Sequence, residues 1–325
     1  CTAHGDCPNS ACDLWTGACF PAAATLWVDG AGRCDDAGPG DQETPLCKLD
    51  VAFERVGAAA PGHQAVRVRP GSYSVQGPLR APAQHVVALV HATGEPGDPA
   101  VTITAASSAA LAVDPGGKLL VDALHLANSG ADGFTCAMGE AWLDRLSISE
   151  ATMHGVAAGA CELVIRRGVL VGNVLAGVSL AGGSLRLENS YVSKNGNPQT
   201  GAGGIYLAEG AELDAVYSTW VENRGQAGTP YAVSCSDDGA KEKVKVRNSL
   251  AINLGSNTLC EGATVEHTGW STDMVTGENM AIALADLDAY LTADGSMPGV
   301  YRVAPGTGLE TLGAWEQGDP VIDFD

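Results

Sequence analysis

The chain has 325 residues and a formal net charge of −20, because 38 Asp and Glu residues outnumber 18 Lys and Arg residues. Nucleic acid and anionic membranes are therefore excluded as expected partners, since both require a cationic surface. Apolar residues make up 45% of the chain but aromatic residues only 5%. The core is thus expected to consist of Ala, Val, Leu and Ile in many short elements, and no apolar run is long enough to span a membrane.

Ten cysteines, an even number, predict five disulfide bonds formed in an oxidising compartment. A zinc site is the rival interpretation, but the chain has no C-x₂-C pair and no His at ligand spacing. No signal peptide is recognisable. We therefore expect an extracellular or cell-surface protein whose targeting segment has already been removed.

Residues 1–20 are predicted to form a small module of their own, followed by a linker over residues 21–24. The segment is too short and polar to hold a core, so two disulfides of unassigned pairing are expected to staple it. It resembles the cysteine-rich modules of secreted bacterial surface proteins. Lipidation of the first cysteine, as in a lipoprotein, is the alternative, but it would leave an odd number of cysteines. The four cysteines are Cys1, Cys7, Cys12 and Cys19.

The next segment alternates short strands with one helix. Strands are predicted over 26–29 and 66–69, with an acidic, glycine-rich loop over 30–43 that Cys34 and Cys47 close. Apolar residues on one face predict a helix over 49–56 that ends at Gly57 or soon after.

This order resembles the N-terminal cap of secreted right-handed parallel β-helix proteins, the pectate-lyase-like superfamily. The resemblance implies that the helix covers the open end of the β-helix, where the first strands would otherwise be exposed. The residues that carry it are Val28-Asp29, Asp35-Asp36, Pro45, the 49–56 helix and Arg69 to Tyr73.

Repeats fill the middle of the chain at intervals of 22 to 30 residues. Each repeat has short segments of alternating apolar residues and a bend of Asn, Ser or Gly, where Asn tolerates left-handed backbone and can bond its stacked neighbour. The pattern predicts an all-β fold: a right-handed, single-stranded parallel β-helix with three short strands per rung. The repeats have polar termini at Asn128, Glu150, Asn173, Asn195, Asn223 and Asn253.

Two cysteine pairs agree with this period, because each is separated by 25 residues. Neighbouring rungs lie roughly 4.8 Å apart, which is within reach of a disulfide. The expected bridges are Cys34–Cys47, Cys136–Cys161 and Cys235–Cys260.

The predicted β-helix covers residues 25–318, with an N-terminal cap over 25–75, rungs over 76–270 and a C-terminal cap over 271–318. Residues 319–325 form a tail. The C-terminal cap resembles the closing segment of the same superfamily. The matching residues are Leu287 to Leu291, Gly295-Ser296 and Leu312 to Glu316.

No catalytic set is recognisable. The superfamily's lyases need calcium-binding carboxylates and a Lys or Arg base, and its hydrolases need several Asp on neighbouring rungs. The third strands present Thr135, Ala157, Ser179 and Tyr206 outward, without an acid, a His or a cation. On the first strands Arg166, Arg167, Arg186, Lys245 and Arg247 are expected to face outward and to form ion pairs across neighbouring rungs with Glu188 and Asp214. Weak catalytic candidates remain in Asp237, Asp238 and Arg224.

Acidic residues recur in the turns after the third strands, and hard cations such as calcium could bridge them. No cofactor is required by this interpretation. The calcium candidates are Asp35, Asp36, Asp41 and Glu43 in the N-terminal loop, and Glu209, Asp237 and Asp238 in the turns.

Insertions lie beside the third strands between residues 191 and 242, where several aromatic residues gather. The leading hypothesis is a protein that binds through this face, in polysaccharide recognition, adhesion or envelope architecture. A polysaccharide lyase or glycoside hydrolase is the alternative, and a subunit of a larger extracellular assembly, with self-association, is the second. The predicted ligand-binding residues are Tyr191, Tyr206, Trp220 and Tyr231.

Overall fold

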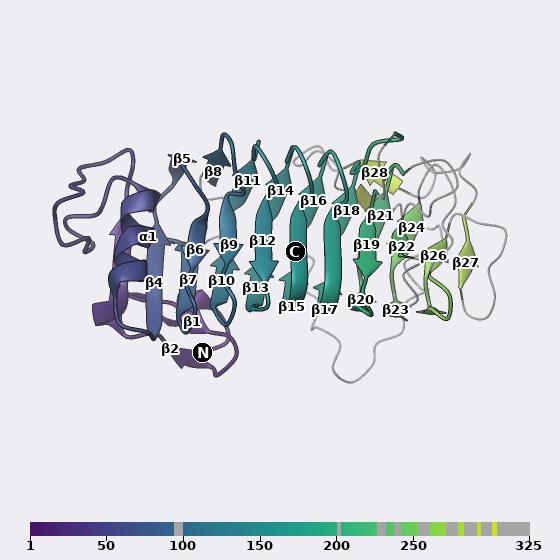
Figure 1. Cartoon of the computed structure of the whole chain (residues 1–325), viewed down its shortest axis with the longest axis horizontal. Coiled ribbons are helices and arrows are strands. Elements are labelled where there is room, and N and C mark those ends of the chain that lie inside the picture. The colour runs from purple at the N-terminus through teal and green to yellow at the C-terminus, as the bar shows by residue number, and fades with distance from the viewer. Residues whose placement is uncertain are drawn as a thin grey trace. The chain divides into compact units, whose positions relative to one another are not determined.

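The fold was analysed in a computed structural model, which describes residues 1–93, 100–199, 203–225, 232–236, 242–252, 260–270, 279–282, 291–293 and 301–303. The chain forms two compact units. Unit 1 comprises residues 1–152 and 157–163, and unit 2 comprises the remainder. Each unit is built of parallel strands that pair with strands one repeat away, as in a right-handed parallel β-helix (Figure 1). The predicted fold class is confirmed.

In unit 1, β4 pairs with β7, β7 with β10, and β10 with β13, so consecutive repeats lie side by side in a first sheet. A second sheet and a third strand stack complete each rung. The first sheet contains β3 (Thr25–Val28), β4 (His63–Val68), β7 (Val86–His91), β10 (Lys118–Asp122) and β13 (Glu140–Asp144). The second sheet contains β5 (Gly71–Val75), β8 (Val101–Ala105), β11 (His125–Ala127) and β14 (Ser147–Ser149). The third stack contains β6 (Leu79–Ala81), β9 (Leu111–Val113) and β12 (Phe134–Ala137).

Unit 2 repeats this arrangement. Strand β15 (Val156–Arg166) contributes residues to both units, and in β17 a third strand and the following first strand run together. The first sheet of unit 2 contains β17 (Val178–Glu188), β20 (Glu212–Val216), β23 (Lys243–Arg247) and β25 (Thr264–Glu266). The second sheet contains β16 (Val169–Val171), β18 (Tyr191–Ser193), β21 (Thr219–Val221), β24 (Leu250–Ile252), β26 (Gly269–Trp270) and β27 (Met280–Ala281). The remaining strands are β19 (Ile205–Ala208), β22 (Val233–Cys235), β28 (Leu291–Ala293) and β29 (Tyr301–Val303).

The helix α1 (Leu49–Ala58) has the amphipathic face that its sequence predicts. Leu49, Ala52, Phe53 and Val56 are buried, and the helix contacts β3, β5 and β6. It ends where predicted, at Ala58. The described parts of the chain include no helix that is long and apolar enough to cross a membrane.

Three asparagines form a ladder inside unit 2. Asn173 Nδ2 donates to Asn195 Oδ1 over 2.8 Å, and Asn195 Nδ2 donates to Asn223 Oδ1 over 3.1 Å. The left-handed backbone lies one residue earlier, at Gly172, Lys194 and Glu222. The predicted stacking of asparagines is thus confirmed, but the residue before each one makes the bend.

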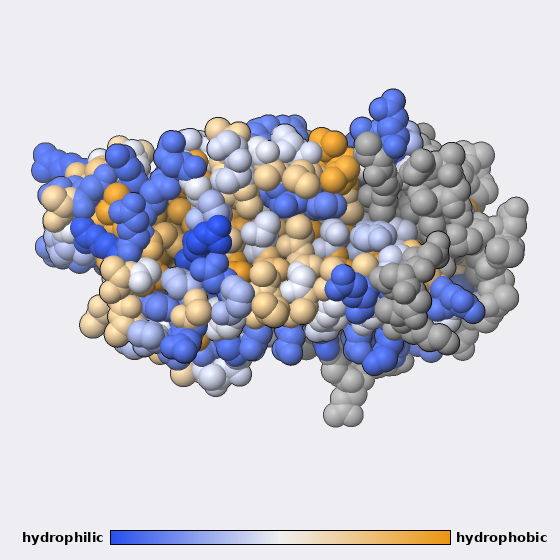
Figure 2. Space-filling view, in the orientation of Figure 1, coloured by the Kyte–Doolittle hydropathy of each residue, from blue (hydrophilic) through white to orange (hydrophobic). Residues whose placement is uncertain are grey.

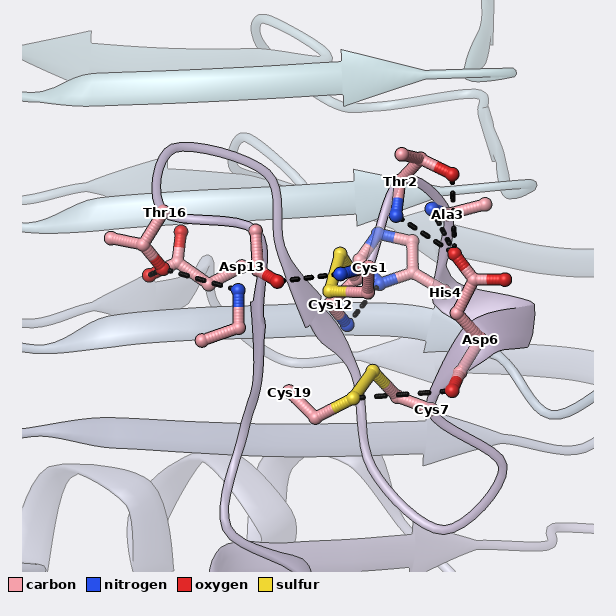
Figure 3. Close-up of a disulfide and its surroundings, with 12 residues drawn as sticks. Cys1, Thr2, Ala3, His4, Asp6, Cys7, Cys12, Asp13, Thr16 and Cys19 are labelled. Atoms are coloured by element: carbon pink, nitrogen blue, oxygen red, sulfur yellow. Dashed lines mark hydrogen bonds between the residues drawn. A yellow bond between two sulfur atoms is a disulfide. The ribbon is translucent and has the colours of Figure 1, made fainter.

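All ten cysteines are in disulfides. Three of the bonds are the pairings expected from spacing, Cys34–Cys47, Cys136–Cys161 and Cys235–Cys260. The N-terminal module contains the other two, Cys1–Cys12 and Cys7–Cys19 (Figure 3). These bonds leave no thiol for the zinc site or for a lipid on Cys1.

The N-terminal module packs on the outer face of the first sheet of unit 1. It contains η1 (His4–Asp6), β1 (Cys12–Asp13) and β2 (Ala18–Cys19), and η2 (Ala22–Ala24) joins it to β3. The ring of Phe20 meets that of His63 edge to face, with centroids 4.8 Å apart. Because the module has no core of its own, it shares one with the outward residues of the sheet. This cluster comprises Ala11, Phe20, Ala65, Ala88, Val90 and Leu120, flanked by Leu14, Trp15, Val86 and Trp142.

Candidate functional site

The outer face of the first sheet in unit 2 carries charged side chains, and we call it the charged face. Leu185, Leu187, Leu213, Val244 and Val246 are buried and point inward, so the residues between them point outward. Two outward rows run across β17, β20 and β23 in exact register with the strand pairing. The edge row is Ser184, Glu212 and Lys243, and the middle row is Arg186, Asp214 and Lys245.

The edge row and one end of the middle row are neutralised within the protein. Lys243 forms an ion pair with Glu212 across the strands. Arg186 forms an ion pair with Glu188, two residues further along the same strand. Ion pairs between rungs were predicted for this face, so the Arg186–Glu188 pair, which lies within one rung, corrects that prediction.

The centre of the middle row has unused bonding capacity. Asp214 Oδ1 is buried and has no hydrogen-bond partner. Lys245 lies beside it on the next strand. Within the described residues its ammonium forms no ion pair or hydrogen bond, so the predicted cross-rung pairing does not join Lys245 to Asp214. A buried carboxylate oxygen without a donor is costly. A ligand with an anionic group would satisfy Lys245, and a ligand hydroxyl would reach Asp214 Oδ1 once its carboxylate turns outward.

The predicted aromatic residues do not share one face. Tyr191 points outward from the second sheet, between Val169 and Thr219. Tyr206 points outward from the third stack, between Ser179 and Ser234. Trp220 is 1% exposed and lies in the core, so its predicted role as a ligand-binding residue is wrong. Trp220 follows the outward Thr219 in β21, and since side chains alternate along a strand, Trp220 points inward. Tyr231 lies outside the described residues.

The weak catalytic candidates are not brought together by the described structure. Arg224 is exposed, and its backbone N–H donates to Asn195 O over 2.7 Å. Asp237 and Asp238 lie outside the described residues, so their predicted roles in catalysis and in calcium binding stay predictions.

The acids of the N-terminal loop hold its turns. Asp36 Oδ1 accepts from the N–H groups of Cys47 and Lys48, and Asp41 Oδ1 accepts from those of Glu43 and Thr44. Asp35 likewise accepts from Ala37 N–H. The described residues bring no three of the calcium candidates within ligand distance of one another. The only such group there is Cys1, Cys7 and Cys12, whose sulfurs are in disulfides.

Beside this loop, Asp29 has a depressed pKa. Burial acts to raise it, but the hydrogen bonds from Arg69, Gly32 and Ala31 outweigh burial and lower the pKa of the carboxyl. Arg69 Nη1 lies 2.8 Å from Asp29 Oδ2. The ionised carboxylate of Asp29 therefore holds together the residues of the N-terminal cap that it binds.

No protein-family model matches the chain, and no curated protein matches its sequence. Among solved structures it is similar to pectate lyase Pel9A, with a TM-score of 0.52 over 90% of this chain and 92% of that chain, at 13% identity. The likeness is one of fold, the parallel β-helix. A rhamnogalacturonan lyase gives a TM-score of 0.48 at 12% identity, over 75% of this chain and 73% of that chain. A pectin methylesterase from Aspergillus niger gives a TM-score of 0.37 at 14% identity, over 80% of this chain and 93% of that chain.

The resemblance predicted from the cap and repeats is confirmed as a likeness of fold. What the sequence interpretation missed is the middle row, because all its charges were expected to pair with one another. The available signal was the third residue of three successive first strands, which reads Arg186, Asp214 and Lys245. Hydrophilic and hydrophobic residues are interspersed on the molecular face shown in Figure 2.

Proposed function

We propose that this protein is a secreted or cell-surface β-helix that binds a polysaccharide containing acidic sugars, and that the charged face of unit 2 is its binding site. The observation that carries the proposal is the middle row, where Lys245 and Asp214 Oδ1 are in register but bonded to neither each other nor another described residue. The five disulfides support an oxidising environment.

The row suits an extended, repeating ligand. Strands of one sheet are roughly 4.8 Å apart, so Arg186 and Lys245, two strands apart, are separated by about 10 Å. Ammonium and guanidinium groups bind carboxylates by charge-assisted hydrogen bonds, and a carboxylate between them accepts from sugar hydroxyls. The likeness in fold to a protein named as a pectate lyase supports this class of ligand.

The test is calorimetric titration of the full chain with polygalacturonate, with neutral dextran as the control ligand. Wild type should bind polygalacturonate, and Lys245→Gln should weaken binding tenfold or more, because one charge-assisted hydrogen bond contributes about 1.5–3 kcal/mol. Lys243→Gln is the matched control, since Lys243 is on the same strand and already paired with Glu212. Equal binding of dextran, or unchanged binding by Lys245→Gln, would contradict the proposal.

The same mixtures separate binding from the alternative, a polysaccharide lyase or hydrolase. Absorbance of unsaturated chain ends, with and without calcium, reports lyase activity, and reducing-end release reports hydrolysis. Turnover that is abolished in the Asp237→Ala/Asp238→Ala variant would replace the binding proposal by the enzymatic one. Light scattering at several concentrations tests the remaining alternative, a subunit of an assembly.

A further inference from the structure

The N-terminal module covers its sheet with a histidine at the contact. His4 is 7% exposed, and its Nδ1 accepts the backbone N–H of Cys12 over 3.0 Å. Its other ring nitrogen, Nε2, is buried and has no hydrogen-bond partner. Figure 3 shows the ring between η1 and the strand that carries Cys12.

This geometry fixes the protonation state of His4. A ring nitrogen that accepts a hydrogen bond carries no proton, so His4 is neutral, with its proton on Nε2. The charged form has protons on both nitrogens. It would lose the bond from Cys12 and leave two N–H donors and a charge buried without partners, which is strongly unfavourable.

The charged groups around His4 belong to the sheet beneath it. Burial lowers the pKa of His4; the charges of Asp122 and Asp144 act to raise it, and those of Arg145 and Arg67 to lower it. Asp122 is already engaged, because Arg145 donates to both of its carboxylate oxygens, over 2.8 and 2.5 Å.

Arg67 is the main polar anchor of the module. Its Nη1 donates to Ser10 O over 2.7 Å and to Cys7 O over 3.1 Å, while Nη2 donates to Ala92 O of the β-helix. Because this guanidinium stays in place beneath the module, a second buried positive charge on His4 would be repelled by it.

Two further charged contacts hold the rim of the module. His63 Nε2 lies 3.1 Å from Asp13 Oδ2. Lys118 Nζ lies 5.1 Å from the centre of the Trp15 ring and pairs with Glu140. The contact between His63 and Asp13 joins the module to β4 without involving His4. Asp13 stays ionised in mild acid, because hydrogen bonds from Thr16, His63 and Trp15 outweigh burial and lower the pKa of Asp13.

We propose that the N-terminal module is a pH-dependent cover of the first sheet of unit 1, held down while His4 is neutral and released when His4 takes up a proton. Release exposes the outward apolar row of Ala65, Ala88, Leu120 and Trp142. The proposal is independent of the charged face of unit 2.

The direction with pH follows from linkage. A histidine whose pKa is lower in the docked state binds its proton more readily once released. Docking is therefore strongest above the ordinary His value of 6.5 and weakens as the pH falls below it. One proton taken up weakens docking by at most tenfold per pH unit, until the pKa of the docked state is reached.

The experiment is hydrogen exchange of the full-length chain between pH 7.5 and 4.5, with disulfides intact and intrinsic rates corrected for pH. Protection of the Cys12 amide reports the bond to His4, and binding of a hydrophobic dye reports release of the module from the sheet. The internal reference is the amide of Ile103, in β8 of the second sheet. We expect Cys12 protection to fall steadily below pH 6.5 and dye binding to rise over the same pH range, while Ile103 protection stays constant.

His4→Asn keeps an acceptor near the position of Nδ1 but cannot take up a proton, so protection of Cys12 should become independent of pH over this range. His63→Gln is the second variant, and it should lower docking at every pH while leaving the slope unchanged. Constant Cys12 protection in wild type, an unchanged slope in His4→Asn, or a slope lost in His63→Gln would each overturn the proposal. If His4→Asn does not fold, wild type and His63→Gln still decide it.

Discussion

The first sheets of the two units use one strand pattern for opposite purposes. In unit 1 the third residues of β10 and β13 are Leu120 and Trp142, which lie under the module. In unit 2 the third residues of β17 (counting from Ser184), β20 and β23 are charged, as Arg186, Asp214 and Lys245. The second and fourth positions are apolar and buried in both units. The inward positions therefore set the fold, and one outward position per strand sets whether a face is covered or open to a ligand.

Removing the anchor on the covered face should have the largest effect. Arg67→Ala leaves three buried carbonyls without their donor, so module docking should weaken by about 3 kcal/mol, roughly a hundredfold. Hydrogen exchange of the Cys12 amide measures it. On the open face, Arg186→Ala removes a half-buried side chain that is paired with Glu188. It should lower the free energy of unfolding by about 1 kcal/mol or less. Equal losses of free energy in Arg67→Ala and Arg186→Ala would contradict the distinction between a covered and an open face.

The disulfides of the module come next. Cys7→Ser/Cys19→Ser opens a loop with a sequence separation of 12 residues and should destabilise the module by about 2–3 kcal/mol. Chemical denaturation followed by exchange at residues 1–20 measures this. Polygalacturonate binding at the charged face should be unchanged, and a parallel loss of binding would contradict the separation of the two faces.

Making the open face resemble the covered one should have an intermediate effect. Lys245→Leu places at β23 the residue type found at Leu120. Binding of polygalacturonate should weaken about tenfold, or ~1.4 kcal/mol, while the free energy of unfolding changes by about 0.5 kcal/mol or less, since this side chain has no partner to lose. If the free energy of unfolding fell by more than the free energy of binding, Lys245 would have a structural role.

The smallest effect is expected at the edge of the open face. Lys243→Gln removes an ion pair whose lysine side chain is 77% exposed, and such pairs contribute about 0–1 kcal/mol. Denaturant midpoints and calorimetric affinities should both stay near those of wild type. A loss of binding as large as that of Lys245→Leu would place the ligand on the edge row instead.

The fold could be predicted from the sequence because its signals are periodic. The 25-residue cysteine spacings, the alternation in each strand and the α1 pattern each reflect one geometric rule. The use of each face could not be predicted in the same way. Nothing in the strand sequences indicates that residues 1–20 fold back over β4, β7 and β10, since this contact depends on segments far apart in the chain.

The candidate site was partly visible. Outward Arg186, Asp214 and Lys245 were recognised, but simple cross-strand pairing was expected for them, and only side-chain geometry shows that Asp214 and Lys245 do not meet. Trp220 illustrates the opposite error. A large aromatic residue near an insertion suggested a sugar-binding platform, whereas the parity of its position in β21 makes it part of the core.

The asparagine ladder has a consequence for how the chain is made. Asn195 Nδ2 donates back to Leu170 O and forward to Asn223 Oδ1, and Asn223 Nδ2 donates back to Val192 O, so the ladder bonds a repeat to both of its neighbours. A repeat that emerges later from the ribosome or an export channel thus finds only its acceptor in the preceding repeat already in place. An interior asparagine of the ladder is fully bonded only when both neighbouring coils are present, so each coil is completed by the one that follows it.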